Sequence, residues 1–553
     1  MNKIVSLIGD NAFLRDTTIF VNTSNCKVQD FNIVNNGTAD GNCNLWGIYV
    51  YEADNEVITG NNITIWDKNT SYGIYLCDSY NNTVANNSIR CQGDNLVFAL
   101  LTFETYDTLF ENNSILAIGT SELYPYYETI CIDGVRSISE LSKTYGVILD
   151  FSSDNQFIHN DIEVTSTVEG FQVPYNPSVN ILIGLYIYND SNRNNISENN
   201  VYIHGHDPFL YGMGSSGDDT SKSVTYACEN IFSKNNITIE ADYFAMGMIL
   251  RHNSKDTTVE ENYFRLDSNN YTYGFTGEIS DYTTFRNNTI NSTSNAGIYA
   301  IELYSSNYND ISDNKIYANG SFATIALFAS SHNNITNNSV RIFGNQSQDP
   351  AQGPEHPDSV VLIHVPISLQ TWSTDNRIED NDIVTDAKNT IDIDETSGYN
   401  TIKNNRLSSA GGGGSETIND RSGKNFISGN SGSRYDSGSD SGSNGNSGSP
   451  IHTNGTSSQS SHSSNSGNAD SNGASAFGNV NSNFNANAQS SASDGAGDAG
   501  EAGDGSDVIA SEIEELASKS ASSGMFVPIV ALILMLVFCF SFLGAKNEDD
   551  DEE

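Results

Sequence analysis

Apolar and polar positions alternate along most of this chain in short runs, and one polar position returns at a nearly fixed interval. It is an asparagine in the frame apolar-x-x-Asn-x-apolar, as in the stretch from Ile58 to Ile63. The asparagines in this frame are Asn61, Asn87, Asn113, Asn160, Asn199, Asn235, Asn262, Asn288, Asn314, Asn338, Asn381 and Asn405. Most successive intervals are 24–27 residues, and four are longer, at 47, 39, 36 and 43. A period in the twenties predicts one supersecondary unit stacked on itself.

A second phrase, a glycine followed by apolar and often tyrosine residues, precedes many of these asparagines. Its clearest copies are Gly47–Val50, Gly73–Leu76, Gly146–Leu149, Gly184–Ile187, Gly247–Leu250 and Gly297–Ala300. Helical spacing is absent, and β-branched and aromatic residues dominate runs of three to five residues. Short strands and turns within about 25 residues favour one coil of a parallel β-helix. We therefore predict an all-β, parallel β-helix solenoid over residues 20–430.

The recurring asparagine has a structural role in such a coil. A turn residue lies directly above its counterpart in the next coil, about 4.8 Å away. Asparagine tolerates left-handed backbone angles, and its amide can donate to one neighbour while it accepts from the other. The pattern predicts an asparagine ladder, with apolar residues such as Ile63 and Ile162 stacked inside. A biased, low-complexity composition is the alternative, but the flanking apolar positions keep the same register.

The chain beyond the repeats changes character twice. Residues 431–524 are rich in Ser, Gly and Asn and cannot bury a core, so we expect a disordered stalk there. Residues 525–544 are twenty largely apolar residues, enough for a helix that crosses a bilayer. Residues 545–553 then form an acidic cytoplasmic tail, and residues 1–19 are either a truncated start or an amino-terminal coil. The many N-x-S/T sequences are compatible with a surface glycoprotein.

The repeats resemble the right-handed parallel β-helix repeats of surface proteins and of periplasmic carbohydrate-binding proteins. Together with the stalk and the apolar segment, the whole chain resembles the adhesin-like proteins of methanogenic archaea. The resemblance covers residues 20–430 and implies a right-handed β-helix followed by a stalk and one transmembrane α-helix. It implies little about activity, because this scaffold carries lyases, hydrolases, adhesins and stalks alike.

Charge and cysteine content narrow the classes of partner. The 553 residues carry a formal charge of −44, with 69 acidic and 25 basic residues, which argues against nucleic acid and anionic surfaces as partners. None of the seven cysteines forms a C-x-x-C pair, so we expect no zinc site, no other metal and no cofactor. We expect most cysteines to behave as small buried residues, although six of them could pair outside the cell.

The four long intervals predict loops inserted at one corner of the coil. Three consecutive ones, at about 118–142, 165–180 and 204–222, should form a single overhang, and a fourth lies at about 343–358. The candidate glycan-binding aromatics on the overhang are Tyr124, Tyr126, Tyr127, Phe171, Tyr175, Phe209 and Tyr211. Aromatic rings stack on the apolar faces of sugars. Alternatively, these rings fold back and seal an apolar flank of the coils, and the sequence leaves both possibilities open.

Candidate catalytic groups are fewer and less coherent. His204, His206 and Asp207 lie close together in the sequence, with His356 and His364 further on. Asp392 and Asp394 are two positions apart, so they would share one face of a strand, and an inverting hydrolase needs two carboxylates about 6.5–9.5 Å apart. No motif ties these acids to a histidine or an arginine, so we assign neither catalytic residues nor a metal site.

The sequence thus favours an adhesin-like protein of the cell surface, single-pass, with its amino-terminal domain outside and a carbohydrate or another cell as its partner. A membrane-tethered lyase or glycoside hydrolase is the rival interpretation, and it requires convergent acids and a base. An inert structural spacer is the third.

Overall fold

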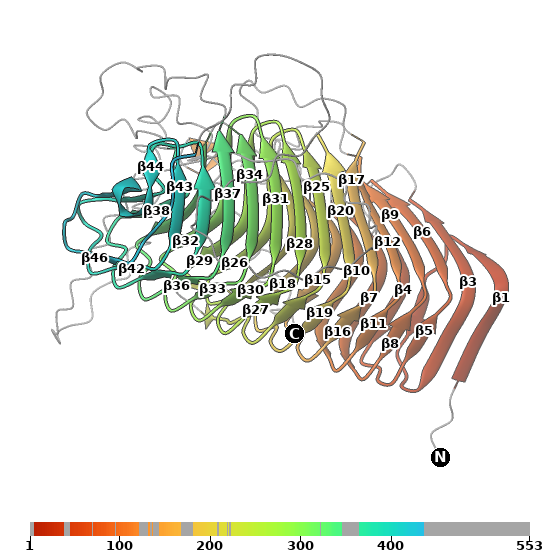
Figure 1. Cartoon of the computed structure of the whole chain (residues 1–553). Coiled ribbons are helices and arrows are strands. Elements are labelled where there is room, and N and C mark those ends of the chain that lie inside the picture. Colours follow the sequence, from red (N-terminus) through yellow and green to blue (C-terminus); the bar gives the residue numbers. More distant parts are fainter. Residues whose placement is uncertain are drawn as a thin grey trace, which may run out of the picture.

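A single stacked solenoid makes up the described part of this chain. The computed structural model describes residues 5–37, 45–68, 70–94, 96–120, 131–132, 135–136, 143–167, 181–206, 209–217, 219–220, 223–320, 322–344 and 364–435. Nearly all of its elements are strands, and almost every strand pairs in parallel with its counterpart one coil away. Figure 1 shows the strands stacked side by side from β1 to β46. The predicted parallel β-helix is confirmed, whereas its right-handed winding stays a prediction.

Each regular coil contributes a short strand and a long strand to sheet A and one strand to sheet B. The short strands are β5 (Val57–Thr59), β8 (Thr83–Ala85), β11 (Leu109–Glu111), β16 (Gln156–Ile158), β19 (Asn195–Ser197), β24 (Ile231–Ser233), β27 (Thr258–Glu260), β30 (Thr284–Arg286), β33 (Asp310–Ser312), β36 (Asn334–Thr336), β39 (Arg377–Glu379), β42 (Thr401–Lys403) and β46 (Phe426–Ser428). The long strands are β6 (Asn62–Asp67), β9 (Ser88–Gly93), β12 (Ser114–Gly119), β17 (Asp161–Ser166), β20 (Asn200–Gly205), β25 (Asn236–Ala241), β28 (Tyr263–Ser268), β31 (Thr289–Ser294), β34 (Lys315–Gly320), β37 (Ser339–Gly344), β40 (Asp382–Thr385) and β43 (Arg406–Ser409).

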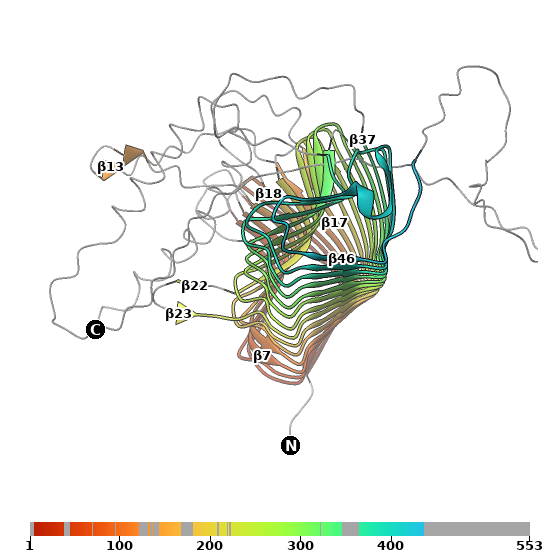
Figure 2. The ribbon, with the colours of Figure 1, turned by 60° about the vertical axis from the view of Figure 1, so that its left-hand side comes forward.

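Sheet B has fourteen strands, one for each of fourteen coils. They are β2 (Ile19–Val21), β4 (Leu45–Tyr51), β7 (Thr70–Tyr80), β10 (Leu96–Tyr106), β15 (Lys143–Asp150), β18 (Ile181–Tyr188), β21 (Phe209–Ser216), β26 (Phe244–Arg251), β29 (Tyr271–Glu278), β32 (Gly297–Tyr304), β35 (Phe322–Phe328), β38 (Ile367–Gln370), β41 (Ile391–Ile393) and β45 (Ile418–Asp420). Figure 2 looks more nearly along the stack and shows the coils lying over one another.

The remaining elements lie at the two ends and in insertions. At the amino-terminal end, β1 (Val5–Arg15) pairs in parallel with β3 (Cys26–Asn36). At the other end, β44 (Gly412–Gly413) pairs antiparallel with β43 and leads into the 3-10 helix η1 (Gly414–Thr417). Two antiparallel pairs, β13 (Cys131–Ile132) with β14 (Val135–Arg136) and β22 (Asp219–Thr220) with β23 (Ser223–Val224), stand outside the coils.

Strand alternation places the apolar residues inside the coils. In β17, Ile162 and Val164 are buried, whereas Asp161 and Glu163 between them face outward and are exposed. The same inward position is repeated from Ile63 to Leu407 and forms one continuous core along the stack. Because neighbouring strands pair without slipping over most of the solenoid, each residue type forms a column one strand spacing apart.

The asparagines of the repeat form a buried hydrogen-bonded column. Asn199 Nδ2 donates to Asn235 Oδ1 at 3.0 Å and to the carbonyl oxygen of Phe157 at 2.9 Å. Asn199 Oδ1 accepts from the backbone N–H of Asn160 at 2.9 Å. The same arrangement runs coil by coil from Asn61 to Asn430. Each asparagine side chain therefore satisfies backbone groups that the turn would otherwise leave unpaired inside the protein.

The left-handed backbone angle falls one residue earlier than the sequence suggested. Glu198 precedes Asn199 and has φ 57°, and His159 before Asn160 has φ 56°. The residue before the ladder asparagine makes the sharp turn and points to solvent, which frees the asparagine to turn its amide inward. The tolerance of asparagine for left-handed angles is therefore not the reason for its recurrence.

A second polar column, which sequence reasoning missed, runs five residues before the first. It contains asparagine or threonine in most coils; Asn155 Nδ2, for example, donates to Asn194 Oδ1 at 3.2 Å. A third column consists mostly of serines, in which the backbone N–H of Ser306 donates to Ser330 Oγ at 3.1 Å. The second column could have been found in the sequence, because its polar residue lies two positions before the apolar residue of each short strand.

Glu56 occupies the second column near its amino-terminal end, where later coils have asparagine or threonine. Its Oε2 accepts from the backbone N–H of Cys26 at 2.9 Å, and its Oε1 has no hydrogen-bond partner among the described residues. Burial raises the pKa of Glu56 to about 7, although the N–H groups of Cys26 and Asn25 oppose the shift. The carboxyl group is therefore largely protonated in the folded protein below neutral pH.

Glu56→Gln is expected to stabilise the protein at pH 8 and to leave its stability at pH 4 nearly unchanged. The folded pKa of about 7 exceeds the ordinary value of 4.5, so the wild type loses stability as pH rises between these values. The shift corresponds to roughly 3 kcal/mol at most, and the amide removes this loss. Thermal unfolding of both proteins from pH 4 to 8 measures it, and parallel pH profiles would contradict the assignment.

The glycine of the second sequence phrase lies where sheet B comes closest to the long strands. A Cβ atom on Gly184 would lie 2.4 Å from Val201 Cγ1 and 2.4 Å from the carbonyl oxygen of Gly212. Gly146 is confined in the same way by Ile162 and by the carbonyl oxygen of Gly184. The missing side chain therefore makes room for the aliphatic column of the long strands.

The third predicted insertion is misplaced. β20 ends at Gly205 and β21 begins at Phe209, so residues 204–222 do not form one loop; the extra residues follow β21 instead. The sequence Gly212-Met213-Gly214 lacks the tyrosine of the usual phrase, which hid this strand. Long segments do separate β12 from β15, β17 from β18 and β37 from β38, so three insertions leave from the corner between the long strands and sheet B.

Several predicted features lie outside the described residues, namely the stalk, the apolar segment 525–544 and the acidic tail. They stay predictions. Within residues 5–435 as described, no helix is long and apolar enough to cross a membrane. Cys26, Cys77 and Cys91 are buried free thiols, and Cys228 is a half-buried free thiol.

Candidate functional site

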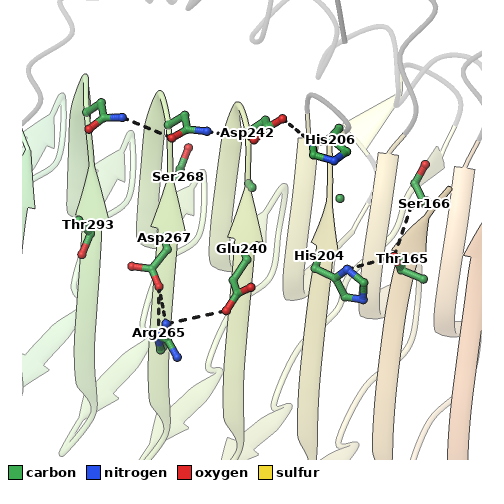
Figure 3. A pocket seen from close by; sticks show the side chains of 14 residues that line it. Thr165, Ser166, His204, His206, Glu240, Asp242, Arg265, Asp267, Ser268 and Thr293 are labelled. Atoms are coloured by element: carbon green, nitrogen blue, oxygen red, sulfur yellow. Dashed lines mark hydrogen bonds and ion pairs between the residues drawn. The ribbon is translucent and has the colours of Figure 1, made fainter. Parts of the chain in front are cut away.

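A groove of about 570 Å³ lies on the outside of sheet A, at the corner where the long strands turn towards sheet B. It crosses five consecutive long strands, β17, β20, β25, β28 and β31, and Figure 3 shows its side chains from close by. Its lining residues are Thr165, Ser166, His204, Gly205, His206, Glu240, Ala241, Asp242, Arg265, Asp267, Ser268, Asn269, Thr293 and Asn295.

The floor of the groove follows from strand register. Thr165, His204, Glu240, Asp267 and Thr293 are paired in succession across the five strands. All five sit at outward positions, because their neighbours along each strand point into the core. Parallel pairing without slippage therefore turns residues separated by 26–39 positions into a straight polar row with one side chain per strand.

His204 is held between two groups of the preceding coil. Its Nδ1 lies 3.2 Å from Thr165 Oγ1, and its Nε2 lies 3.2 Å from Glu163 Oε1. The ring of Tyr202 stacks on the imidazole, with ring centres 4.8 Å apart. Tyr202 in turn donates its hydroxyl to Glu240 Oε2 at 3.1 Å, and burial together with Glu240 raises the pKa of Tyr202.

Arg265 is the cation of the groove floor. Its Nη2 lies 3.0 Å from Asp267 Oδ2 on the same strand and 3.8 Å from Glu240 Oε1 on the neighbouring strand. The guanidinium therefore sits between two carboxylates and keeps further N–H donors for other acceptors. Figure 3 shows this group beside the row formed by Thr165, His204 and Glu240.

A second row forms the rim, where the long strands end. His206 Nδ1 lies 2.5 Å from Asp242 Oδ2. Asn269 Nδ2 donates to Asp242 Oδ1 at 3.0 Å, and Asn295 Nδ2 donates to Asn269 Oδ1 at 3.3 Å. The rim is thus a hydrogen-bonded chain of imidazole, carboxylate and amides that runs parallel to the floor (Figure 3).

The groove offers many hydrogen-bonding groups without burying them. The side chains that form its ion pairs are each 36–53% exposed. They are Glu163, His204, His206, Glu240, Asp242, Arg265 and Asp267. Exposed ion pairs of this kind contribute little to stability. Carboxylates accept from hydroxyl groups, while arginine and amide N–H groups donate to them. The arrangement therefore suits a polar ligand that carries both donors and acceptors and lies across several strands.

Of the aromatic residues predicted to bind glycans, the two that the structure describes, Phe209 and Tyr211, do not line this groove. Tyr124, Tyr126, Tyr127, Phe171 and Tyr175 lie outside the described residues. Phe209 and Tyr211 belong to β21 rather than to a loop, on the outer face of sheet B. Phe209 is only 5% exposed and its ring stacks on Phe244 at 5.0 Å, while Tyr211 is half-buried beside it. For Phe209, the structure therefore favours the alternative of a sealed apolar flank.

The structure brings two of the candidate catalytic groups together and places three others away from them. His204 and His206 both line the groove, whereas Asp207 and His356 lie outside the described residues. His364 is many coils away, where its Nε2 lies 2.7 Å from Asp386 Oδ1.

Asp392 and Asp394 do not form the expected pair on one strand face. β41 ends at Ile393, so Asp394 lies in the turn, where its Oδ1 accepts from the backbone N–H groups of Thr396 and Ser397 at 2.9 and 2.8 Å. Asp392 is fully buried, and its Oδ2 accepts from Arg421 Nη2 at 2.8 Å.

Sequence reasoning found the two histidines of the groove and missed its acids and its arginine. Glu240, Asp242, Arg265 and Asp267 follow the ladder asparagines Asn235 and Asn262 at fixed distances, so aligning the coils on those asparagines would have brought them together. Among the described residues, no group of three or more histidine, cysteine or acidic side chains is placed to hold a metal ion.

One protein-family model matches part of this chain. Residues 218–353, about a quarter of the chain, match the family model "Periplasmic copper-binding protein (NosD)". A search of curated proteins gives no match.

Three solved structures illustrate the similarity of the backbone to known proteins. The Dettilon tailspike protein is 12% identical with a TM-score of 0.33, and the match covers 77% of this chain and 62% of that one. DFA-IIIase from Arthrobacter chlorophenolicus, without its lid, is 12% identical with a TM-score of 0.37, covering 77% and 88%. A mutant of the periplasmic alginate epimerase AlgG is 11% identical with a TM-score of 0.33, covering 76% and 77%. This chain therefore spans less than two thirds of the tailspike.

Proposed function

We propose that this protein is a cell-surface, adhesin-like protein whose β-helix binds neutral carbohydrate chains in the groove between Thr165 and Asn295. The observation that carries the proposal is the double row of exposed donors and acceptors across five strands. A polysaccharide presents hydroxyl groups at regular intervals, and a row with one polar side chain about every 4.8 Å can bind several of them at once.

Charge selects the class of carbohydrate. Among the residues that the structure describes there, four carboxylates, Glu163, Glu240, Asp242 and Asp267, lie in or beside the groove against one guanidinium, that of Arg265. The chain as a whole carries a formal charge of −44. Uronates and sulfated glycans would be repelled, so the groove favours neutral glycans.

We also propose that the β-helix is held on the outside of the cell by the segments that follow it. The predicted stalk at 431–524 and the predicted membrane helix at 525–544 would hold the β-helix outside the cell, with residues 545–553 inside. The match to a family described as periplasmic agrees with a location outside the cytoplasm. The resemblance to adhesin-like proteins of methanogenic archaea belongs to this proposal as well.

Copper, which the matching family is named for, forms no part of the proposal. Within the matched residues, His252 and His332 occupy different coils, and the ring of His332 stacks on Tyr308 at 4.9 Å. Among the described residues there, no group of three histidine, cysteine or acidic side chains is placed to hold a metal ion.

Removing the rim pair with His206→Ala and Asp242→Ala is expected to weaken glycan retention at least about tenfold. Each hydrogen bond to a charged group contributes about 1.5–3 kcal/mol. The measurement is retention of neutral plant, mucin and cell-wall polysaccharides by the purified full-length chain in mild detergent, with polymer length followed in parallel.

A matched control exists in the same solenoid. His159 and Glu198 form an exposed pair at 2.8 Å, 50% and 46% exposed, against 52% and 44% for His206 and Asp242. His159→Ala with Glu198→Ala should leave retention unchanged. Equal losses in both double variants, or no retention by the wild type, would count against the groove and favour a structural spacer.

A further inference from the structure

The outer face of sheet B carries a cluster of ionisable side chains far from the groove floor. It spans three adjacent strands, β26, β29 and β32. In register, Arg251 pairs with Glu278 and Glu278 with Tyr304, while Thr276 pairs with Glu302. Glu278 and Glu302 therefore project from the same face of neighbouring strands, two residues out of step. Their Cα atoms lie about 8 Å apart, from one strand spacing and two residue rises.

Glu278 is held as an ionised carboxylate. Arg251 Nε donates to Glu278 Oε2 at 2.6 Å, and the two side chains are only 7% and 10% exposed. Burial alone would raise the pKa of Glu278, but the charge and hydrogen bond of Arg251, with a contribution from His252, hold it below the usual range. A carboxylate that is ionised, nearly dry and fixed by a planar guanidinium has a defined orientation.

Glu302 is in the opposite protonation state. Glu302 is half-buried. This burial, together with the nearby charge of Glu278, raises the pKa of Glu302 to about 8. Its carboxyl group therefore carries a proton at neutral pH. Two neighbouring carboxyl groups whose surroundings push their pKa values apart are the arrangement that supplies an acid and a nucleophile in one site.

Half-buried tyrosines surround the pair. Tyr273 and Tyr304 lie on the same outer face, and Glu302 contributes to the raised pKa of both. Tyr271 continues this aromatic surface along β29, and Tyr211 and Tyr186 continue it on preceding coils. Flat rings beside hydrogen-bonding groups are suited to pyranose rings, which have apolar faces and polar edges.

We propose that Glu302 and Glu278 form a glycosidase-type acid and nucleophile pair that hydrolyses neutral polysaccharides on the outer face of sheet B. Glu302 gives its proton to the glycosidic oxygen as the bond from that oxygen to the anomeric carbon breaks. Glu278 forms an ester with the anomeric carbon. Water then attacks that carbon, releases Glu278 and returns a proton to Glu302, so the net reaction consumes one water per bond.

The chemistry of each residue fixes its role. A carboxylate with a lowered pKa is a weak base, so Glu278 suits direct bonding to carbon better than removal of a proton from water. Arg251 is a positioning residue, since it reaches the reaction only through Glu278. The site is separate from the binding groove, and this activity does not require the proposed binding function to be correct.

The test uses the full-length chain in mild detergent with a defined set of probes: laminarin, xylan, mannan, starch and soluble cello-oligosaccharides. The wild type is expected to release new reducing ends from at least one of them near neutral pH, with activity falling above about pH 8 as Glu302 ionises. Glu302→Gln and Glu278→Gln should each lower the rate by about 100-fold or more.

Two further variants keep the result interpretable. Glu198→Gln changes an exposed glutamate on another face and should leave the rate unchanged. Glu278→Ala should regain bond cleavage with azide as an external nucleophile, a rescue that a purely structural role would not give. No release from any probe, or equal rates in the wild type and Glu302→Gln, would overturn the proposal. Retention of glycans without release would overturn hydrolysis and leave the groove proposal standing.

Discussion

Asn199→Leu is expected to lower the free energy of unfolding by about 3–6 kcal/mol, because leucine has similar volume but none of the amide's hydrogen bonds. The change removes the acceptor of the Asn160 N–H, which lies 2.9 Å away, and the donors to Phe157 and Asn235. All these groups are buried, so each one left unpaired costs about 1–3 kcal/mol. Urea unfolding followed by circular dichroism measures the loss.

Asn200 provides the matched control. It is the next residue in the chain and is exposed, and its Nδ2 donates to Asp161 Oδ1 at 2.8 Å on the surface. Asn200→Leu should change stability by only about 0.5 kcal/mol. Hydrogen exchange should also show faster opening of the coils around residue 199 in the ladder variant alone. If the two variants lose the same stability, the ladder is not what holds neighbouring coils together.

Arg251→Met is expected to cost about 3–5 kcal/mol at neutral pH, because it leaves the carboxylate of Glu278 buried without its partner. The loss should shrink as pH falls, since protonation of Glu278 removes the unpaired charge. The double variant Arg251→Met with Glu278→Met should recover most of the stability. Thermal unfolding at neutral and acidic pH compares the three proteins.

An exposed pair tests whether burial is the cause. Arg193 Nη2 lies 2.6 Å from Asp154 Oδ2, and the two side chains are 52% and 37% exposed. Arg193→Met should therefore cost no more than about 1 kcal/mol. A similar cost for Arg193→Met and Arg251→Met would show that water reaches Glu278 freely, and would also weaken the case for its role as a nucleophile.

The coil could be predicted from the sequence because one position in each coil from Asn61 to Asn430 is occupied by asparagine. Asn199 and its counterparts must supply donors and an acceptor to a buried turn, so they recur at fixed distances from Val201 and its counterparts. The second polar column was hidden because threonine or glutamate replaces asparagine there, as at Thr108 and Glu56. A hydroxyl group or a protonated carboxyl group can meet part of the same need.

The sites were harder to predict than the coil, because their members meet only across coils. Glu240 and Asp267 are 27 residues apart, and Arg251 and Glu278 are also 27 apart. When the strand Phe209–Ser216 is not recognised in the sequence, each later strand is matched with the wrong counterpart, one element away. Local motifs therefore indicated the two groove histidines, whereas the acids and arginines required the register that only the stacked structure provides.

The asparagine column also has a direction. Between the asparagine side chains, each Nδ2 from Asn61 to Asn405 donates to the Oδ1 of the next coil towards the carboxyl-terminal end. Parallel amide dipoles add, as they do along a helix, whereas β-sheets have only small net dipoles. The rod therefore has an electrical polarity along its axis, positive at its carboxyl-terminal end, and its two ends differ in the ions they attract even where their side chains are alike.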